Sequence, residues 1–137
     1  MYKKILVPVD GSEKAAKAAM HAAKLASEQN AEITLFHVVY DLPQFSYNSP
    51  IIIEELHRQG LEIIETLRKL PDLNDRVFDY EIVVGQPADE ICKKAKDGGY
   101  DLLVMGNRGL GEIKGYLMGS VSNRVIRHAV CPVLIVR

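Results

Sequence analysis

The sequence has few cysteines, no block of like charge and no long apolar run, and each absence excludes a class of protein. Its two cysteines, Cys92 and Cys131, lie far apart without the paired spacing of a zinc cluster or a disulfide framework. Lysine and arginine (17) nearly balance aspartate and glutamate (18), which speaks against nucleic acid or an acidic membrane as the main partner. The first apolar run, residues 5–9, is too short for a signal peptide or a membrane-spanning helix. We therefore expect a cytoplasmic protein.

The length and apolar content predict one domain over residues 1–137. A chain of 137 residues with 47% apolar residues can bury one sizeable core, but it is too short for two ordinary domains. Cys92 lies on the apolar stripe of a predicted helix and Cys131 precedes a predicted strand, so both are expected to pack as small hydrophobic residues.

Five short apolar runs bounded by turn signals predict β-strands. They cover residues 5–9, 33–39, 80–84, 101–105 and 133–136. Four of them are nearly continuous in valine, isoleucine and leucine, as is typical of parallel strands that are covered on both faces.

Four helical periods fall between these strands, at residues 13–28, 51–69, 87–97 and about 120–128. The first is rich in alanine, and the residues predicted to share its buried face include Ala16, Ala19, Ala23 and Ala26. The second repeats the pattern with Ile52, Leu56, Ile63 and Leu67. Strands alternating with helices predict an α/β fold, a doubly wound five-stranded parallel sheet with helices on both faces.

The segment 40–50 interrupts this alternation with two prolines, polar residues and aromatic residues. Such a composition suits an ordered flap over a site at the strand ends. A surface excursion with no role explains it equally well.

A glycine-rich segment follows the fourth strand, and half of the chain's ten glycines lie between Gly106 and Gly119. Glycine permits positive φ and lets a ligand approach backbone amides that a side chain would shield. The segment ends where Gly119 and Ser120 open the last helix, whose amides and dipole attract phosphate. The hydroxyls of Ser120 and Ser122 could donate further hydrogen bonds.

The end of the first strand is expected to face this segment, because ligands of open parallel sheets bind where the strand order reverses. Pro8 and Val9 could wall a flat base. Asp10 could accept from a ribose hydroxyl or hold a magnesium ion, although it could equally cap the following helix, a role for which Ser12 is also suited. In the second strand Val38 could line the pocket through its backbone, whereas His37 is expected to be a packed residue.

The spacing of Gly106, Gly109, Gly119 and Ser120 resembles the ATP-binding signature of the universal stress protein family. Two residues separate the first two glycines and nine separate the second from the third. The likeness extends over essentially the whole chain, through residues 4–12, 85–88, 101–106 and 131–136.

The resemblance implies a Rossmann-like sheet of strand order 3-2-1-4-5 and an ATP site with the adenine near Val9 and Val38. The triphosphate would follow the glycine-rich segment, where Arg108 could contact phosphate or stay solvated. The candidate nucleotide-binding residues are Pro8, Val9, Asp10, Val38, Met105, Gly106, Arg108, Gly109, Gly119, Ser120, Val121 and Ser122, with Asp10 also the candidate Mg²⁺ ligand. The resemblance further implies a homodimer paired through residues 133–136. Glu112 and Lys114 have no assigned role.

Several other functions fit the sequence less well. The turn after the first strand lacks the Gly-x-Gly-x-x-Gly of dinucleotide-binding domains, the chain has no P-loop, and Asp10 lacks the acidic neighbours of a receiver domain. Two alternatives stay open: an enzyme that hydrolyses ATP slowly or with a partner's help, and a dimeric adaptor that binds no nucleotide. The favoured hypothesis is an ATP-binding stress-response or signalling module, in which ATP changes the surface that a protein partner meets.

Overall fold

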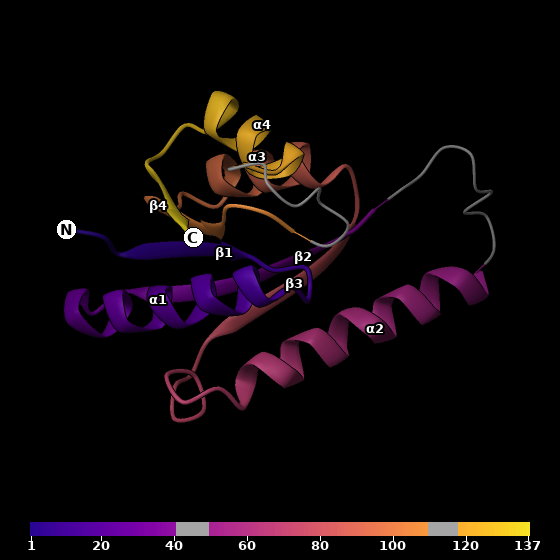
Figure 1. Cartoon of the computed structure of the whole chain (residues 1–137), viewed down its shortest axis with the longest axis horizontal. Coiled ribbons are helices and arrows are strands. Elements are labelled where there is room, and N and C mark those ends of the chain that lie inside the picture. The colour runs from indigo at the N-terminus through magenta and orange to yellow at the C-terminus, as the bar shows by residue number, and fades with distance from the viewer. Residues whose placement is uncertain (41–49, 110–117) are drawn as a thin grey trace.

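The structure is a computed structural model that describes residues 1–40, 50–109 and 118–137. Its elements alternate along the chain (Figure 1). They are β1 (Lys4–Pro8), α1 (Glu13–Gln29), β2 (Glu32–Tyr40), α2 (Pro50–Arg68), β3 (Asp79–Gly85), α3 (Pro87–Asp97), β4 (Leu102–Gly106), α4 (Ser120–His128) and β5 (Val133–Val136). The predicted flap lies outside the described residues except at its two ends, as do Gly111, Glu112, Lys114 and Gly115 of the glycine-rich segment.

The five strands form one parallel sheet of order β3-β2-β1-β4-β5, which confirms the predicted fold. From β1 the chain adds β2 and then β3 on one side. It then crosses to the other side of β1, where β4 and β5 follow. The last pair between β1 and β2 joins Pro8 to Phe36, while β2 continues beside β3 as far as Tyr40. The end of β2 therefore projects beyond its neighbour β1.

Helices cover both faces of the sheet, α1 and α2 on one and α3 and α4 on the other (Figure 1). Successive side chains of a strand point to opposite faces. In β1, Ile5 and Val7 pack with the alanines of α1, whereas Leu6 packs with Ile91 of α3 and Val125 of α4. The fold thus has two cores, separated by the sheet.

Helix α1 lies close to the sheet because its buried face is made almost wholly of alanine. Its N-cap Ser12 accepts a hydrogen bond from the Ala15 amide at 3.1 Å, and Asn30 ends it in the left-handed conformation. The predicted buried face is confirmed for Ala19, Ala23 and Ala26, but Ala16 is only partly buried.

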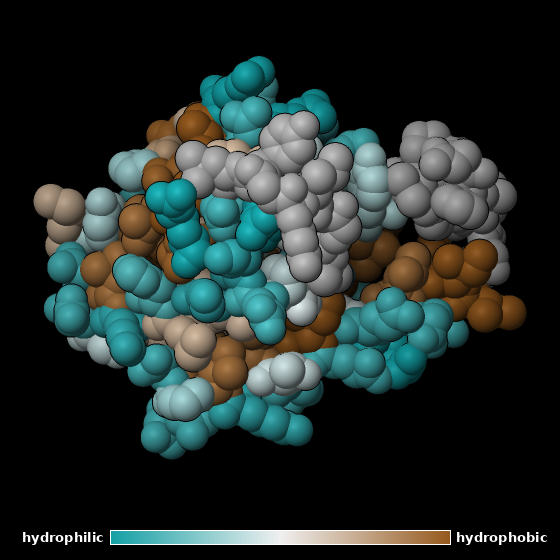
Figure 2. All heavy atoms as spheres, viewed as in Figure 1, coloured by the Kyte–Doolittle hydropathy of each residue, from teal (hydrophilic) through white to brown (hydrophobic). Residues whose placement is uncertain are grey.

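The predicted apolar face of α2 is wrong at its amino-terminal end. Ile52 is 45% exposed, although Leu67 is buried. The first turns of α2 project away from the sheet (Figure 1), and apolar side chains gather at this end of the helix (Figure 2). Close contact with the sheet comes at Gly60, where a Cβ atom would lie 2.9 Å from Cδ2 of His37. The periodic pattern therefore extends further along the helix than the burial does.

Both cysteines are free, half-buried, and packed against the core beneath α3 and α4. Burial raises the pKa of each thiol. None of the described helices is long and apolar enough to cross a membrane.

Candidate functional site

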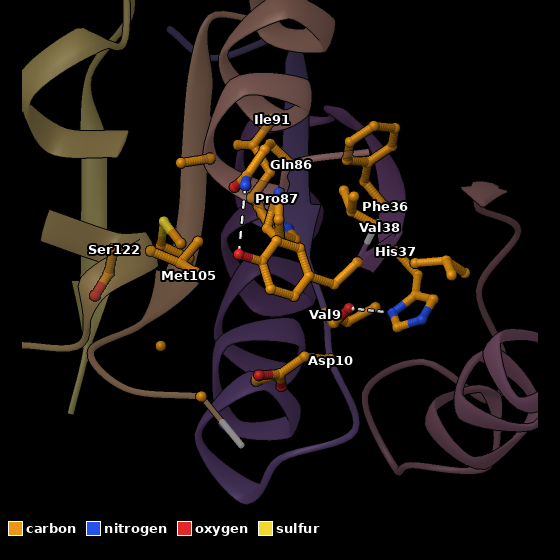
Figure 3. A pocket seen from close by; sticks show the side chains of 18 of the residues that line it. Val9, Asp10, Phe36, His37, Val38, Gln86, Pro87, Ile91, Met105 and Ser122 are labelled. Carbon is orange, nitrogen blue, oxygen red and sulfur yellow. Dashed lines mark hydrogen bonds between the residues drawn. The ribbon is translucent and has the colours of Figure 1, made fainter. Parts of the chain in front are cut away.

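A cavity of about 830 Å³ opens at the carboxyl edge of the sheet, where β1 and β4 lie side by side (Figure 3). This is the point where the strand order reverses, the usual ligand position in open α/β sheets. Its volume is within the range of small-molecule pockets. It is lined by Pro8, Val9, Asp10, Ala15, Phe36, His37, Val38, Val39, Tyr40, Leu56, Gln59, Ile63, Gln86, Pro87, Ala88, Ile91, Met105, Gly106, Arg108, Gly109, Ser120, Val121, Ser122 and Arg124.

The backbone N–H and C=O groups of Val38 point to the β1 side of β2, at a level beyond the carboxyl end of β1. The amide of Val9 donates to the carbonyl of Phe36 at 2.9 Å, so the backbone groups of Phe36 face β1. Backbone groups alternate in direction along a strand, and those of Val38 therefore face the same way, beyond the last paired residue of β1. The edge of a planar base could form hydrogen bonds with such groups.

The turn between β1 and α1 places the Asp10 carboxylate against the glycine-rich segment. Its Oδ1 accepts from the Ser12 amide at 3.0 Å, and its Oδ2 lies so close to Gly109 that a Cβ atom there would overlap it. Asp10 thus holds the turn and lines the cavity, but it does not cap α1 as one of the predicted alternatives had it. Ser12 is the cap of α1.

Gly106 and Gly109 allow close approach of other parts of the chain, and none of the three signature glycines has positive φ. Among the described glycines only Gly11 and Gly99 have positive φ, so the conformational reason expected from the sequence does not apply to Gly106, Gly109 or Gly119. A Cβ atom on Gly106 would lie 2.8 Å from Cβ of Lys14 and 2.9 Å from its carbonyl carbon. Gly106 therefore lets β4 and α1 pack, whereas Gly109 makes room for a carboxylate.

Helix α4 begins at the edge of the cavity. Its first hydrogen bond runs from the Asn123 amide to the Gly119 carbonyl at 3.0 Å, so the amides of Ser120, Val121 and Ser122 have no acceptor within the helix. The Ser122 hydroxyl donates to the Asn107 carbonyl at 2.8 Å. A serine hydroxyl has a single proton. In this arrangement Ser122 fixes the helix to the end of β4, and donation to a phosphate would require its O–H to turn.

His37 has a more definite place than the sequence predicted. Its Nδ1 lies 2.8 Å from the Val9 carbonyl oxygen (Figure 3). A carbonyl can only accept, so Nδ1 carries the proton. The His37 ring also lies close enough to Gly60 of α2 that a Cβ atom there would crowd it, and His37 lines the cavity.

The structure brings all the predicted binding residues to the cavity wall except Gly119. That residue is the buried N-cap of α4, and its amide donates to the Asn107 carbonyl at 2.6 Å. Magnesium usually takes one or two carboxylates and completes its shell with water and phosphate. The single carboxylate of Asp10, beside Gly109, fits that kind of site, and no group of three acidic, histidine or cysteine residues forms a cage within the described part of the chain.

Sequence reasoning missed the wall formed by the end of β2 and the start of α3. The Gln86 side chain donates to the Tyr40 hydroxyl at 3.3 Å and joins these two elements beside the cavity (Figure 3). Gln86 precedes α3 without capping it through its side chain. Residues 85–88 belong to the family likeness, but the sequence does not indicate which of their side chains face a ligand. Arg124 of α4 was also missed.

The chain is similar to known proteins along its whole length. Residues 1–137 match the Universal stress protein family. The Universal stress protein YxiE of Bacillus subtilis is 36% identical over 148 residues, with the whole of both chains covered. The structure of the hypothetical protein MJ0577 of Methanocaldococcus jannaschii superposes with a TM-score of 0.85 at 35% identity, covering 99% of this chain and 96% of the other.

A third relative was solved with a ligand. It is a universal stress protein in complex with cAMP, 27% identical to this chain, with a TM-score of 0.66 and coverage of 99% of this chain and 97% of the other. The family match over every residue, the curated relative and the shared sheet order agree. This chain therefore belongs to the universal stress protein family.

Proposed function

We propose that this protein binds an adenine nucleotide, with ATP as the principal ligand, and acts as a nucleotide-dependent module in a stress response. The observation that carries the proposal is the convergence of three elements on one cavity. These are the end of β1, the projecting backbone edge of β2 and the amino end of α4. Each suits one part of a nucleotide.

The adenine is placed against Pro8, Val9 and Val38, since these residues offer an apolar surface next to a backbone edge. The ribose then lies near Asp10. The phosphates follow Gly109 toward the amides at the start of α4, where the helix dipole favours negative charge. The cAMP bound to a related universal stress protein supports a nucleotide of this class.

Asp10 is proposed to hold Mg²⁺ when a triphosphate is bound. The ion would neutralise part of the phosphate charge that the Asp10 carboxylate would otherwise repel. The alternative partner for Asp10 is a ribose hydroxyl, and both assignments place its carboxylate at the centre of the site.

Occupancy of this site is proposed to change the surface that a protein partner meets, in a cytoplasmic homodimer joined through β5. A ligand shifts an equilibrium only as far as it prefers one state. The elements that surround the cavity also form the outer surface at this edge of the sheet, so a bound nucleotide alters both together.

Calorimetric titration with ATP tests the proposal on the wild type and on Gly109→Val. The valine side chain would occupy the space of the Asp10 carboxylate. We expect the wild type to bind and the variant to bind at least about tenfold more weakly, which corresponds to about 1.4 kcal/mol.

Gly99→Asn is the matched control. Gly99 lies in the turn before β4, at the opposite edge of the sheet, with a φ of +67° that asparagine tolerates, and nothing lies within 4 Å of an added Cβ. It should bind ATP as the wild type does. Equal affinity in Gly109→Val and the wild type would remove the glycine-rich segment from the proposal, and steady release of phosphate from ATP would identify an enzyme instead.

A further inference from the structure

Two arginines line the described part of the cavity, and the nucleotide signature accounts for only one of them. Arg108 lies between the first two signature glycines. Arg124 comes from α4 and belongs to no part of the signature. Apart from Asp10, the charged groups on the described wall are thus cationic. Two guanidinium groups together with the helix terminus suit an anion with several phosphates better than the terminus alone would.

The position of Arg124 on α4 directs its side chain toward the start of the helix. Arg124 follows Ser120 by four residues, so the two lie on the same face of α4, one turn apart. Side chains of an α-helix tilt toward its amino end, and a long one covers the preceding turn. The guanidinium can therefore reach the first turn of α4.

Arg124 is now held by a weak partner that it can leave. Its Nη2 lies 3.2 Å from Oδ1 of Asp89, in the first turn of α3, and both side chains are about half exposed. Exposed ion pairs of this kind contribute about 0–1 kcal/mol to stability. A phosphate offers the guanidinium more charge and a two-pronged geometry, so exchanging Asp89 for phosphate costs little.

We propose that Arg124 binds the phosphate groups of the nucleotide and makes the site select nucleoside di- and triphosphates over monophosphates. This inference rests on the proposed function, since it concerns the ligand of the same cavity. Asp89 keeps the guanidinium beside the cavity until the ligand arrives. The ion pair that joins α3 to α4 then opens when a polyphosphate binds.

The test measures the affinities of ATP, ADP, AMP and adenosine for the wild type and for Arg124→Gln. We expect the variant to lose about tenfold in ATP affinity, or about 1.4 kcal/mol, and to lose much less for AMP and nothing for adenosine. The matched control is Arg127→Gln, which removes the same charge from the next turn of α4 at an exposed position that does not line the cavity. It should leave all four affinities nearly unchanged.

Asp89→Asn supplies the second arm. Releasing Arg124 from its partner should strengthen ATP binding by up to about fivefold, the equivalent of an exposed ion pair. In the double variant with Arg124→Gln this gain should disappear, because the gain depends on the guanidinium. A gain that persists in the double variant would show that Asp89 acts by its charge alone, and would overturn the exchange of partners.

The outcomes separate the two proposals. A wild type that binds no adenine nucleotide ends both. A wild type that binds ATP while Arg124→Gln keeps its preference among the four ligands leaves the proposed function standing and refutes the role of Arg124. Equal losses for adenosine and ATP would show contact with the base or general damage, and would also refute it. Thermal unfolding of the ligand-free variant should match the wild type.

Discussion

Gly106 and Gly109 belong to the same signature, but their surroundings differ in kind. An atom added to Gly106 meets the main chain of Lys14 in α1, which cannot move without shifting the helix. An atom added to Gly109 meets the end of the Asp10 side chain, which can rotate. One glycine is therefore required by the fold and the other by the site.

Alanine substitutions should separate these two roles. Gly106→Ala is expected to lower the free energy of unfolding by about 1–3 kcal/mol, as overpacking does. Gly109→Ala should stay close to the wild type in stability, because the displaced Asp10 carboxylate can turn, and should bind ATP less tightly. Urea denaturation combined with ATP titration measures both quantities. A Gly106→Ala protein as stable as the wild type would show that β4 and α1 have room that the structure denies them.

Single residues were predictable from the sequence where their chemistry is local. Ser12 precedes an amphipathic helix, and its capping role follows from that position alone. The bond from Ser122 to the Asn107 carbonyl could not be predicted, because it joins residues fifteen positions apart across the glycine-rich segment. Arg124 was missed for a related reason: α3, whose Asp89 holds it, is distant in the sequence.

At the level of the elements, α2 differs most from its prediction. The apolar period runs through the whole helix, yet only its second half meets the sheet closely, starting at Gly60. Ile51 and Ile52 in its first turn are 78% and 45% exposed. A hydrophobic period indicates which face is apolar, but it does not indicate how far the opposing sheet extends.

Substitutions along α2 should therefore have very different costs. Ile64 is fully buried, and Ile64→Ala is expected to lower the free energy of unfolding by about 2–5 kcal/mol. Ile52→Lys puts a charge in place of an apolar side chain but should change stability by no more than about 0.5 kcal/mol, since the side chain is exposed. Chemical denaturation of the two variants measures the difference. A large loss in Ile52→Lys would mean that the first half of α2 is covered in solution.

The strands and the other helices were predicted to within one or two residues at each end. The valine, isoleucine and leucine runs of β1, β2 and β4 are largely buried, so for these strands the burial pattern and the sequence pattern coincide, whereas the edge strands β3 and β5 are only partly buried. Strand order is different, because hydrophobic periodicity says nothing about which strands are neighbours. The order 3-2-1-4-5 came from the family resemblance, and the structure confirms it.

In the molecule as a whole, the edges of the sheet are β3 and β5. An edge strand offers backbone groups to another chain, and β5 is the edge proposed for pairing with a second copy. Val130, just before β5, is 66% exposed and would add apolar surface to such an interface.

Sedimentation velocity should therefore show a species of twice the chain mass of 15.3 kDa that dissociates on dilution. Val130→Asp should shift it toward the monomer, because a charge would be placed in the apolar contact. Val77→Asp is the matched control, since Val77 is 96% exposed and precedes the opposite edge strand, β3. Should both variants behave as the wild type, or should the wild type sediment as a monomer, pairing through β5 is wrong.

The cavity wall draws on residues from Pro8 to Arg124, almost the full span of the chain. A ribosome releases the amino end first, so β1 and β2 emerge long before α4 completes the wall. The proposed nucleotide site would stay incomplete until α4 had left the exit tunnel and packed on the sheet. The proposed nucleotide therefore cannot guide the early steps of folding. It can stabilise only a chain that has already folded.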